Sequence, residues 1–487
     1  MFAWNGRAIK LVIRQQARLK MKINSFLNQN PWRRIFFITI SLTASSASAE
    51  YSVYQGEYGF LSGRMQVQMA ALGEINERSG DPGADKLSNI YWEHTFEPEI
   101  RGGLNLGEGS QLYSDFSMIY SAMLGHDPSG ITFRGHPHSS RDDYAPYPDF
   151  KEWMMAEQMH IGWKSGKLFE ALGQDAIDFS AGSQDYKLGT GLLLANGTDD
   201  GGFRGSYWIG SRTVFVNTLI ARINFKSLKF EGFYLENNPR NPENRKRYTG
   251  MNMEYNYKDV VNVGFSYIND DHYGGSLTAV TDAYDFRLDF KPLPHELPGL
   301  SISTEYVYQL NNKLTDVDPN NPTLYWYGDM GEKSISGGFG QIEYRFSETP
   351  WQPTLSYRYA YMQRGFDFMN FGFKTWGTWF QGEINGEFIF DNTDLITNTT
   401  RLVLSPTESV TVNLIYLNYQ LDDPAVWSVS SSDYGNEVDL VADWAVSDAV
   451  DIAAGIETFI PNKGGKQVFG GGNEMWIQTM VYASFKF

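Results

Sequence analysis

The stretch YDFRLDF, Tyr284–Phe290, alternates apolar and charged side chains without a break. Successive side chains of a β-strand point to opposite faces, so this pattern predicts a strand with one apolar and one charged face. The same alternation recurs in residues 251–257, 342–346, 355–361 and 438–444. Glycine (48 residues) and aromatic residues (15%) are abundant, which suits many strands joined by tight turns.

The number and spacing of such segments indicate a transmembrane barrel. A soluble sandwich would also alternate, but no contiguous apolar run in this chain could form the core of a soluble protein of this size. In lipid, only helices and closed barrels satisfy all backbone hydrogen bonds. We therefore predict an all-β fold, an antiparallel barrel of about 18 strands with short periplasmic turns and long external loops.

The N-terminal segment predicts export. Arg33 and Arg34 precede a short apolar run, Ile35–Leu42, and the segment ends in the small residues Ala47–Ala49. These features are those of a secretory signal peptide. We expect residues 1–49 to be removed, with the native start at Met21, and residues 50–487 to form a single barrel domain.

The last predicted strand, Met475–Phe487, is amphipathic and ends in phenylalanine. It resembles the recognition signal of bacterial outer-membrane proteins. The expected location is the Gram-negative outer membrane. The expected partners are its lipids and the barrel-assembly machinery that inserts such proteins.

The charge balance excludes several kinds of partner. Residues 1–49 carry eight basic residues and no acid, so residues 50–487 hold 32 basic and 57 acidic residues, a net charge of −25. Such an acidic chain is unsuited to nucleic acid. There is no cysteine, which excludes disulfides and thiolate metal sites.

Several short motifs resemble the alginate-export family of outer-membrane porins. They are Gly182–Tyr186, Gly189–Leu193, Asp199–Gly205, Gly435–Leu440 and Gly455–Pro461. The resemblance implies an 18-stranded barrel that passes an anionic polysaccharide through an arginine-lined pore, with possible periplasmic export partners.

The strand phase places several charged side chains on the lumen face. These candidate pore-lining or substrate-binding residues are Arg101, Arg287, Arg345, Arg358, Arg401, Glu305 and Glu343. Arginine suits carboxylates because its planar fork binds them through two hydrogen bonds and keeps its charge. Two interpretations stay open: a basic ladder that guides an anionic sugar, or arginines that pair with neighbouring acids and brace the wall.

The segment Phe371–Phe390 lies in a long predicted loop and is rich in aromatic residues. We expect part of it to fold inward and narrow the pore, with Trp376, Trp379 and Glu383 at the constriction. The alternative is an external loop that packs on itself.

The resulting functional prediction is a passive channel for a polar, anionic solute such as an alginate-like polysaccharide or oligosaccharide. The alternative is a porin for other small solutes, such as organic acids or neutral sugars. An outer-membrane hydrolase is a distant third, because no nucleophile and base form a recognisable motif. We predict no enzyme activity, no cofactor and no metal site.

Overall fold

The computed structural model describes residues 50–80, 88–125, 150–198, 209–239, 245–272, 278–315, 334–372, 380–386, 392–425 and 427–487. Residues 50–487 form one compact unit. The predicted signal peptide, residues 1–49, lies outside the described residues.

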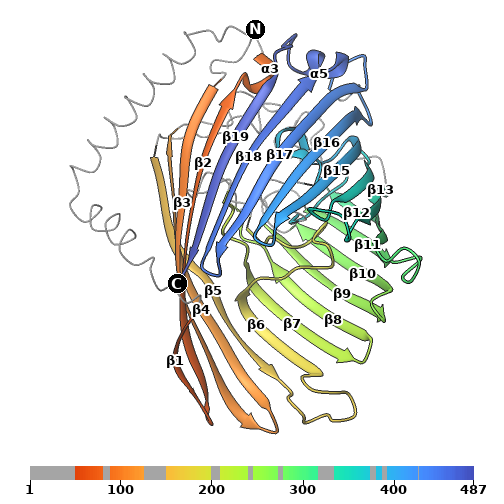
Figure 1. Ribbon diagram of the computed structural model, residues 1–487. Helices are drawn as coiled ribbons and strands as arrows, with labels where there is room; N and C mark the ends of the chain where they lie inside the picture. The colour runs from red at the N-terminus through yellow and green to blue at the C-terminus, as the bar shows by residue number, and fades with distance from the viewer. Residues whose placement is uncertain are drawn as a thin grey trace, which may run out of the picture. The chain divides into compact units, whose positions relative to one another are not determined.

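The described chain is built almost entirely of strands (Figure 1). In chain order they are β1 (Tyr51–Gly56), β2 (Gly59–Ile75), β3 (Ser88–Gly107), β4 (Ser110–Gly125), β5 (Phe150–Lys164), β6 (Ile177–Gln184), β7 (Phe215–Phe225), β8 (Leu228–Glu236), β9 (Lys246–Tyr257), β10 (Val261–His272), β11 (Thr278–Phe290), β12 (Leu300–Thr315), β13 (Ser334–Arg345), β14 (Thr354–Met362), β15 (Leu395–Thr407), β16 (Val410–Leu421), β17 (Asp433–Ser447), β18 (Val450–Pro461) and β19 (Trp476–Lys486). Three short helical segments interrupt the loops: α3 (Glu77–Gly80), η4 (Gly382–Gly386) and α5 (Lys463–Val468).

Strands β2 to β19 form a closed antiparallel barrel. Each strand pairs with the next, and β19 returns to pair with β2, where Phe485 lies opposite Val67. The barrel therefore has the 18 strands that the alternation predicts, and the predicted fold class is confirmed. No helix in the described part of the chain is long and apolar enough to span a membrane.

Two predicted boundaries are wrong. The alternation predicts a first strand over residues 63–72, with residues 50–62 before it, but Tyr51–Gly56 forms β1, which pairs with the first five residues of β2 beyond the end of β19. The alternation also predicts a strand over residues 167–183, but β6 begins only at Ile177. Gly166, Gly173 and Asp175 have positive φ, so the chain turns through residues 165–176 instead of extending.

The two faces of the strands follow the predicted phase. Large apolar side chains on the outer face, such as Phe286 and Tyr357, are about half exposed. Alternate residues on the other face, such as Asp285 and Ser356, are buried. An apolar outer band on a closed barrel is what lipid requires. The chain is therefore a closed β-barrel with an apolar outer surface and an interior lined by polar residues.

Candidate functional site: the lumen and its inward loops

Two external loops meet inside the barrel. Residues 185–198 follow β6, and residues 363–372 follow β14. The backbone N–H of Asn370 donates to Leu193 O at 2.9 Å, and Ala195 N–H donates to Asn370 O at 2.8 Å. These bonds form a short parallel bridge between the loops. A paired loop backbone satisfies its own polar groups, as burial requires.

Both loops are also tied to the lumen face of the strands. Thr190 Oγ1 donates to Glu305 Oε2 at 2.5 Å, and Tyr248 OH donates to Asn370 Oδ1 at 2.5 Å. Their apolar residues Leu192 and Leu193 are at most 1% exposed. They pack among inward-facing residues of several strands. The two loops therefore occupy interior space on the β8–β14 side.

The segment that was expected to fold inward does so in the part that the structure describes. In η4, the backbone N–H groups of Ile384 and Asn385 donate to the Glu437 carboxylate on β17, at 3.0 and 3.2 Å. Gly382 has a φ of +95°, and a Cβ there would collide with Tyr419 Oη. The turn is thus locked onto the barrel wall. Glu383 is 2% exposed, whereas Trp376 and Trp379 lie outside the described residues.

Arg358 and Arg401 lie on neighbouring strands next to this segment. Arg358 pairs opposite Thr399, two residues from Arg401 along β15. The Arg358 guanidinium contacts two aromatic rings, 5.3 Å from the Phe339 centroid and 5.1 Å from the Phe380 centroid. Arg358 therefore contacts the inward loop, and Arg401 lies on the neighbouring strand.

Arg401 is held by an amide. Its Nε and one terminal nitrogen both donate to Asn413 Oδ1, at 3.0 and 2.6 Å. This contact orients the side chain without neutralising it. The same Asn413 donates through Nδ2 to Asp443 Oδ2 at 3.4 Å, so a carboxylate also lies close to Arg401.

Arg287 belongs to a different arrangement, one that braces the wall. It is 7% exposed and donates to Asp285, to Ser266 Oγ at 2.9 Å and to Asn252 Oδ1 at 2.6 Å. Glu305 is close by and accepts the loop hydroxyl of Thr190. For these two residues the bracing interpretation describes what the structure shows.

The other predicted residues are dispersed. Arg345 is exposed at the end of β13 and donates to Gln352 in the following turn at 2.5 Å. Glu343 lies on the same strand, opposite Ser356. Arg101 is separate from both and lines a cavity. The seven residues therefore do not form one continuous ladder.

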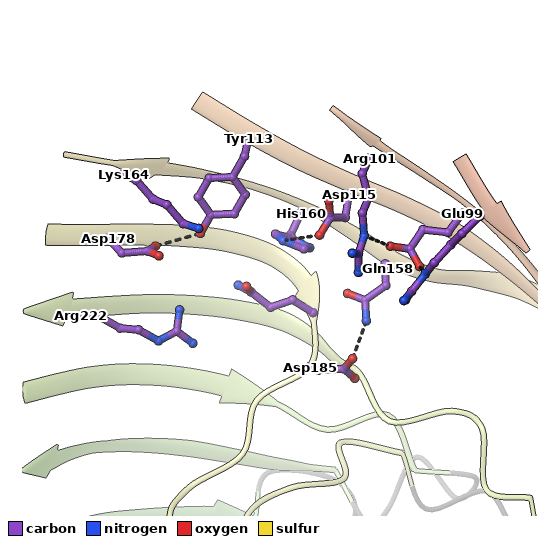
Figure 2. Close-up of a pocket in the computed structure, with 12 residues that line it drawn as sticks. Glu99, Arg101, Tyr113, Asp115, Gln158, His160, Lys164, Asp178, Asp185 and Arg222 are labelled. Atoms are coloured by element: carbon purple, nitrogen blue, oxygen red, sulfur yellow. Dashed lines mark hydrogen bonds and ion pairs between the residues drawn. The ribbon is translucent and has the colours of Figure 1, made fainter. Parts of the chain in front are cut away.

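That cavity lies against the lumen faces of β2 to β7, has a volume of about 320 Å³ and is shown in Figure 2. Its lining is almost entirely polar. It consists of Arg64, Glu99, Arg101, Tyr113, Asp115, Gln158, His160, Lys164, Asp178, Gln184, Asp185 and Arg222.

A row of cross-strand neighbours runs through the middle of the cavity. Arg101 pairs opposite Asp115, which pairs opposite His160, which pairs opposite Gly182. Gly182 has a φ of +124°, and a Cβ there would collide with the backbone of β5. The glycine of the Gly182–Tyr186 motif thus permits the close approach of β6 to His160.

Of these residues, Arg101 is among the candidates predicted from the sequence, and Glu99, two residues before it on β3, lies on the same face. The strand phase also places Arg64 there, since it alternates with the apolar residues of β2. What it does not show is that side chains from six strands converge, because convergence depends on register between strands. No group of three or more His, Asp or Glu side chains in the described ranges is arranged to hold a metal ion.

The chain is similar to Pseudomonas aeruginosa OccK9 (OpdG), with 12% identity, a TM-score of 0.54 and coverage of 88% of this chain and 98% of that one. The fold is that of an outer-membrane porin. The P. aeruginosa outer membrane protein OprD matches with 11% identity, a TM-score of 0.50 and coverage of 88% and 93%. P. aeruginosa OpdK, solved with vanillate, matches with 9% identity, a TM-score of 0.50 and coverage of 87% and 98%.

No family model matches the sequence, and no curated protein sequence matches it. The resemblance to outer-membrane porins is therefore supported at the level of the barrel. The narrower resemblance to the alginate-export family is not specifically supported, because the three structures described above are Occ- and OprD-type porins.

Proposed function

We propose that the protein is a passive outer-membrane channel for small polar solutes, with a preference for anions. The observation that carries this proposal is the position of Arg358 and Arg401. Both project from adjacent strands into the lumen, where Phe380 of an inward loop meets Arg358. Cationic groups at a narrowing, surrounded by a low-dielectric wall, raise the local concentration of anions.

A small solute suits this interior better than a polysaccharide. The loops around residues 185–198, 363–372 and 380–386 pack against the lumen wall, and their apolar residues are buried there. These loops reduce the space inside the barrel that a polymer chain would need. Translocation of an alginate-like chain is therefore the weaker interpretation, and small organic acids or sugars are the stronger one.

The net charge of the chain does not contradict an anion preference. Some of its acids are paired with cations of the protein itself, as Asp285 is with Arg287. A carboxylate that faces a cation contributes little net field to the lumen.

The test is the reversal potential of the purified protein in a planar bilayer under a KCl gradient. We expect anion selectivity that falls when Arg358 and Arg401 are both changed to Gln. The matched control is Arg247→Gln, because Arg247 lies on the opposite face of β9 from the buried Tyr248 and pairs with Asp271. Cation selectivity in the unaltered protein would refute the proposal. Anion selectivity that is the same in the unaltered protein and in the double variant would also refute it.

A further inference from the structure

A row of four polar side chains crosses the strands at which the barrel closes. Asp439 on β17 lies opposite Glu457 on β18, and Glu457 lies opposite Gln478 on β19. Gln478 in turn lies opposite Glu74 on β2. The four strands are neighbours in Figure 1. Opposite residues of paired strands point to the same face. All four side chains of this acidic row therefore point to the inside of the barrel.

The acidic row is buried, and most of its polar atoms have no partner in the protein. Each of the four residues is at most 2% exposed. Both oxygens of Glu457, both oxygens of Glu74 and Oδ1 of Asp439 form no hydrogen bond with the described residues. A buried polar group without a partner is costly, and a buried carboxylate without one is far more costly. The row therefore has the composition of a site that a positive group completes.

Apolar side chains flank the acidic row on both sides. Two residues along the same strands, Phe459 lies opposite Trp476 on one side, and Met480 lies opposite Leu72 on the other. All four are at most 2% exposed. Carboxylates repel one another strongly in surroundings of such low polarity. A positive charge within the row would replace this repulsion by attraction.

Gln478 gives evidence that is independent of the acids. Its amide is neutral, so charge repulsion does not explain why neither the oxygen nor the nitrogen has a partner among the described residues. Amide and carboxylate oxygens together are the ligands that Ca²⁺ takes in proteins. An unpartnered amide oxygen beside unpartnered carboxylates is thus the expected donor set for this ion.

A glycine makes room for one of these carboxylates. Gly455 precedes Glu457 by two residues on β18 and lies on the same face. A Cβ at this position would collide with Glu457 Oε1. The Glu457 carboxylate therefore lies in space that the glycine leaves free. Both residues belong to the Gly455–Pro461 motif, for which the channel proposal gives no role.

We propose that Asp439, Glu457 and Gln478 bind one Ca²⁺ ion through their side-chain oxygens. Opposite side chains on neighbouring strands have Cβ atoms about 5 Å apart. Ca²⁺ lies about 2.4 Å from each oxygen ligand, so one ion can contact side chains of adjacent strands. Two of the three ligands are acids, and the third is an amide. Glu74, on the other side of Gln478, adds negative charge that favours a cation.

Calcium suits this position better than magnesium. Mg²⁺ keeps several of its water molecules when it binds to proteins. The apolar side chains on both sides of the row offer those waters no hydrogen-bond partner. The site does not depend on the proposed channel function. It departs from the absence of a metal site predicted from the sequence, because its ligands come together only through the register of three strands.

The test is unfolding in urea of the purified barrel, after removal of divalent ions with EDTA and with or without added CaCl₂. We expect Ca²⁺ to raise the unfolding midpoint, since an ion that binds only the folded state stabilises it. Glu457→Gln should weaken Ca²⁺ binding at least about tenfold, because a charged ligand is lost. The matched control is Asp451→Asn. It removes a carboxylate from the same face of the same strand and should keep the full calcium effect.

A second measurement locates the ion. Tb³⁺ takes the oxygen ligands of Ca²⁺ and emits light when a nearby indole is excited. Trp476 lies two residues before Gln478 on the same face of β19. We expect emission that Ca²⁺ displaces and that Trp476→Phe weakens. Trp444→Phe is the control, because Trp444 is 49% exposed on the outer face of β17.

A second variant keeps the test decisive if Glu457→Gln does not fold. Gln478→Met keeps the charge of the row and nearly its volume, and it should also weaken Ca²⁺ binding. An unfolding midpoint that is equal in CaCl₂ and in EDTA would overturn the proposal and would indicate that protons neutralise the row. A calcium effect that persists undiminished in Glu457→Gln or Gln478→Met, or an equal effect of MgCl₂, would overturn it as well.

Discussion

The guanidinium carbon of Arg358 lies 5.1 Å from the centroid of the Phe380 ring, and the same arginine donates to Phe380 O at 3.2 Å. A residue of a barrel strand and a residue of an external loop are thus joined by a cation–π contact and a hydrogen bond. A desolvated cation–π contact of this kind contributes about 2 kcal/mol. Arg358 therefore holds the loop in its inward position and also places a positive charge in the lumen.

This relationship predicts the effect of removing the ring. Phe380→Ala should raise single-channel conductance, because it removes bulk from the lumen and loosens the loop. The matched control is Phe286→Ala on the lipid face, where the side chain is 50% exposed. Conductance of Phe380→Ala that equals that of the unaltered protein would show that this segment does not limit the passage.

A second prediction concerns the carboxylate that holds η4. Glu437 accepts hydrogen bonds from two backbone N–H groups and from Asn385 Nδ2 at 2.9 Å. Glu437→Ala should cost about 2 to 3 kcal/mol, because buried donors lose a charged acceptor. Glu437→Gln should cost less, because its amide oxygen still accepts. The measurement is unfolding in urea, and an Ala variant no less stable than the Gln variant would argue against the clamp.

A third prediction uses the absence of native cysteine. A Cβ added to Gly372 would lie 2.6 Å from Ala195 Cβ, so the two loop backbones touch, and a shift of about 1 Å gives the spacing of roughly 3.5 to 4.5 Å that a disulfide requires. The double variant Ala195→Cys, Gly372→Cys should form a disulfide under mild oxidation, seen as a mobility change on non-reducing gels. Pairing of Ala195→Cys with a cysteine at Ser409, in the β15–β16 turn, is the negative control. No cross-link in the first pair would contradict the bridge between the loops.

A fourth prediction is a pH dependence at the start of β15. The pKa of Asp394 is raised to about 7, chiefly by burial and also by the neighbouring Asp422 and Asp423, against hydrogen bonds from Asp423 N and Trp427 Nε1 that lower it. The pKa of the folded state lies above the unfolded value of about 3.9. The stabilisation is therefore complete below about pH 4 and is lost as the pH rises through 7.

The readout is the fluorescence of Trp427, whose Nε1 donates to Asp394 Oδ2 at 2.6 Å. It is obtained as the difference between the protein and Trp427→Phe. We expect a titration with a midpoint near pH 7 that disappears in Asp394→Asn. A titration that survives this substitution would assign the midpoint to another group.

The sequence predicted the barrel well, because lipid imposes its pattern on every strand separately. The alternation in Tyr284–Phe290 has one physical cause, an apolar outside and a polar inside, and it can be read without knowing which strand lies next. The two wrong boundaries, at β1 and β6, both fall at the turn end of the barrel, where side chains leave the lipid and the pattern weakens.

The site was harder to predict because its contacts join distant parts of the chain. Leu194 pairs with Asn370 and Glu99 holds Arg64, yet nothing in the local sequence around any of these residues specifies its partner. The strand phase gave the face on which Arg101 and Arg358 lie. It could not show that one enters a cavity while the other meets a loop, because loop packing is a tertiary property.

The barrel closes where β19 pairs with β2, so closure requires the last strand of the chain. Gln66 and Gln68 donate to Ser484 and Tyr482, partners more than 400 positions away along the chain. Until the last strand is in place, the sheet has two unpaired edges, and each edge can form hydrogen bonds with another chain. Contacts this remote form slowly when unassisted. Loss of β19 would therefore leave an open sheet that aggregates, not a narrower barrel, so translation and export must finish before the barrel can close.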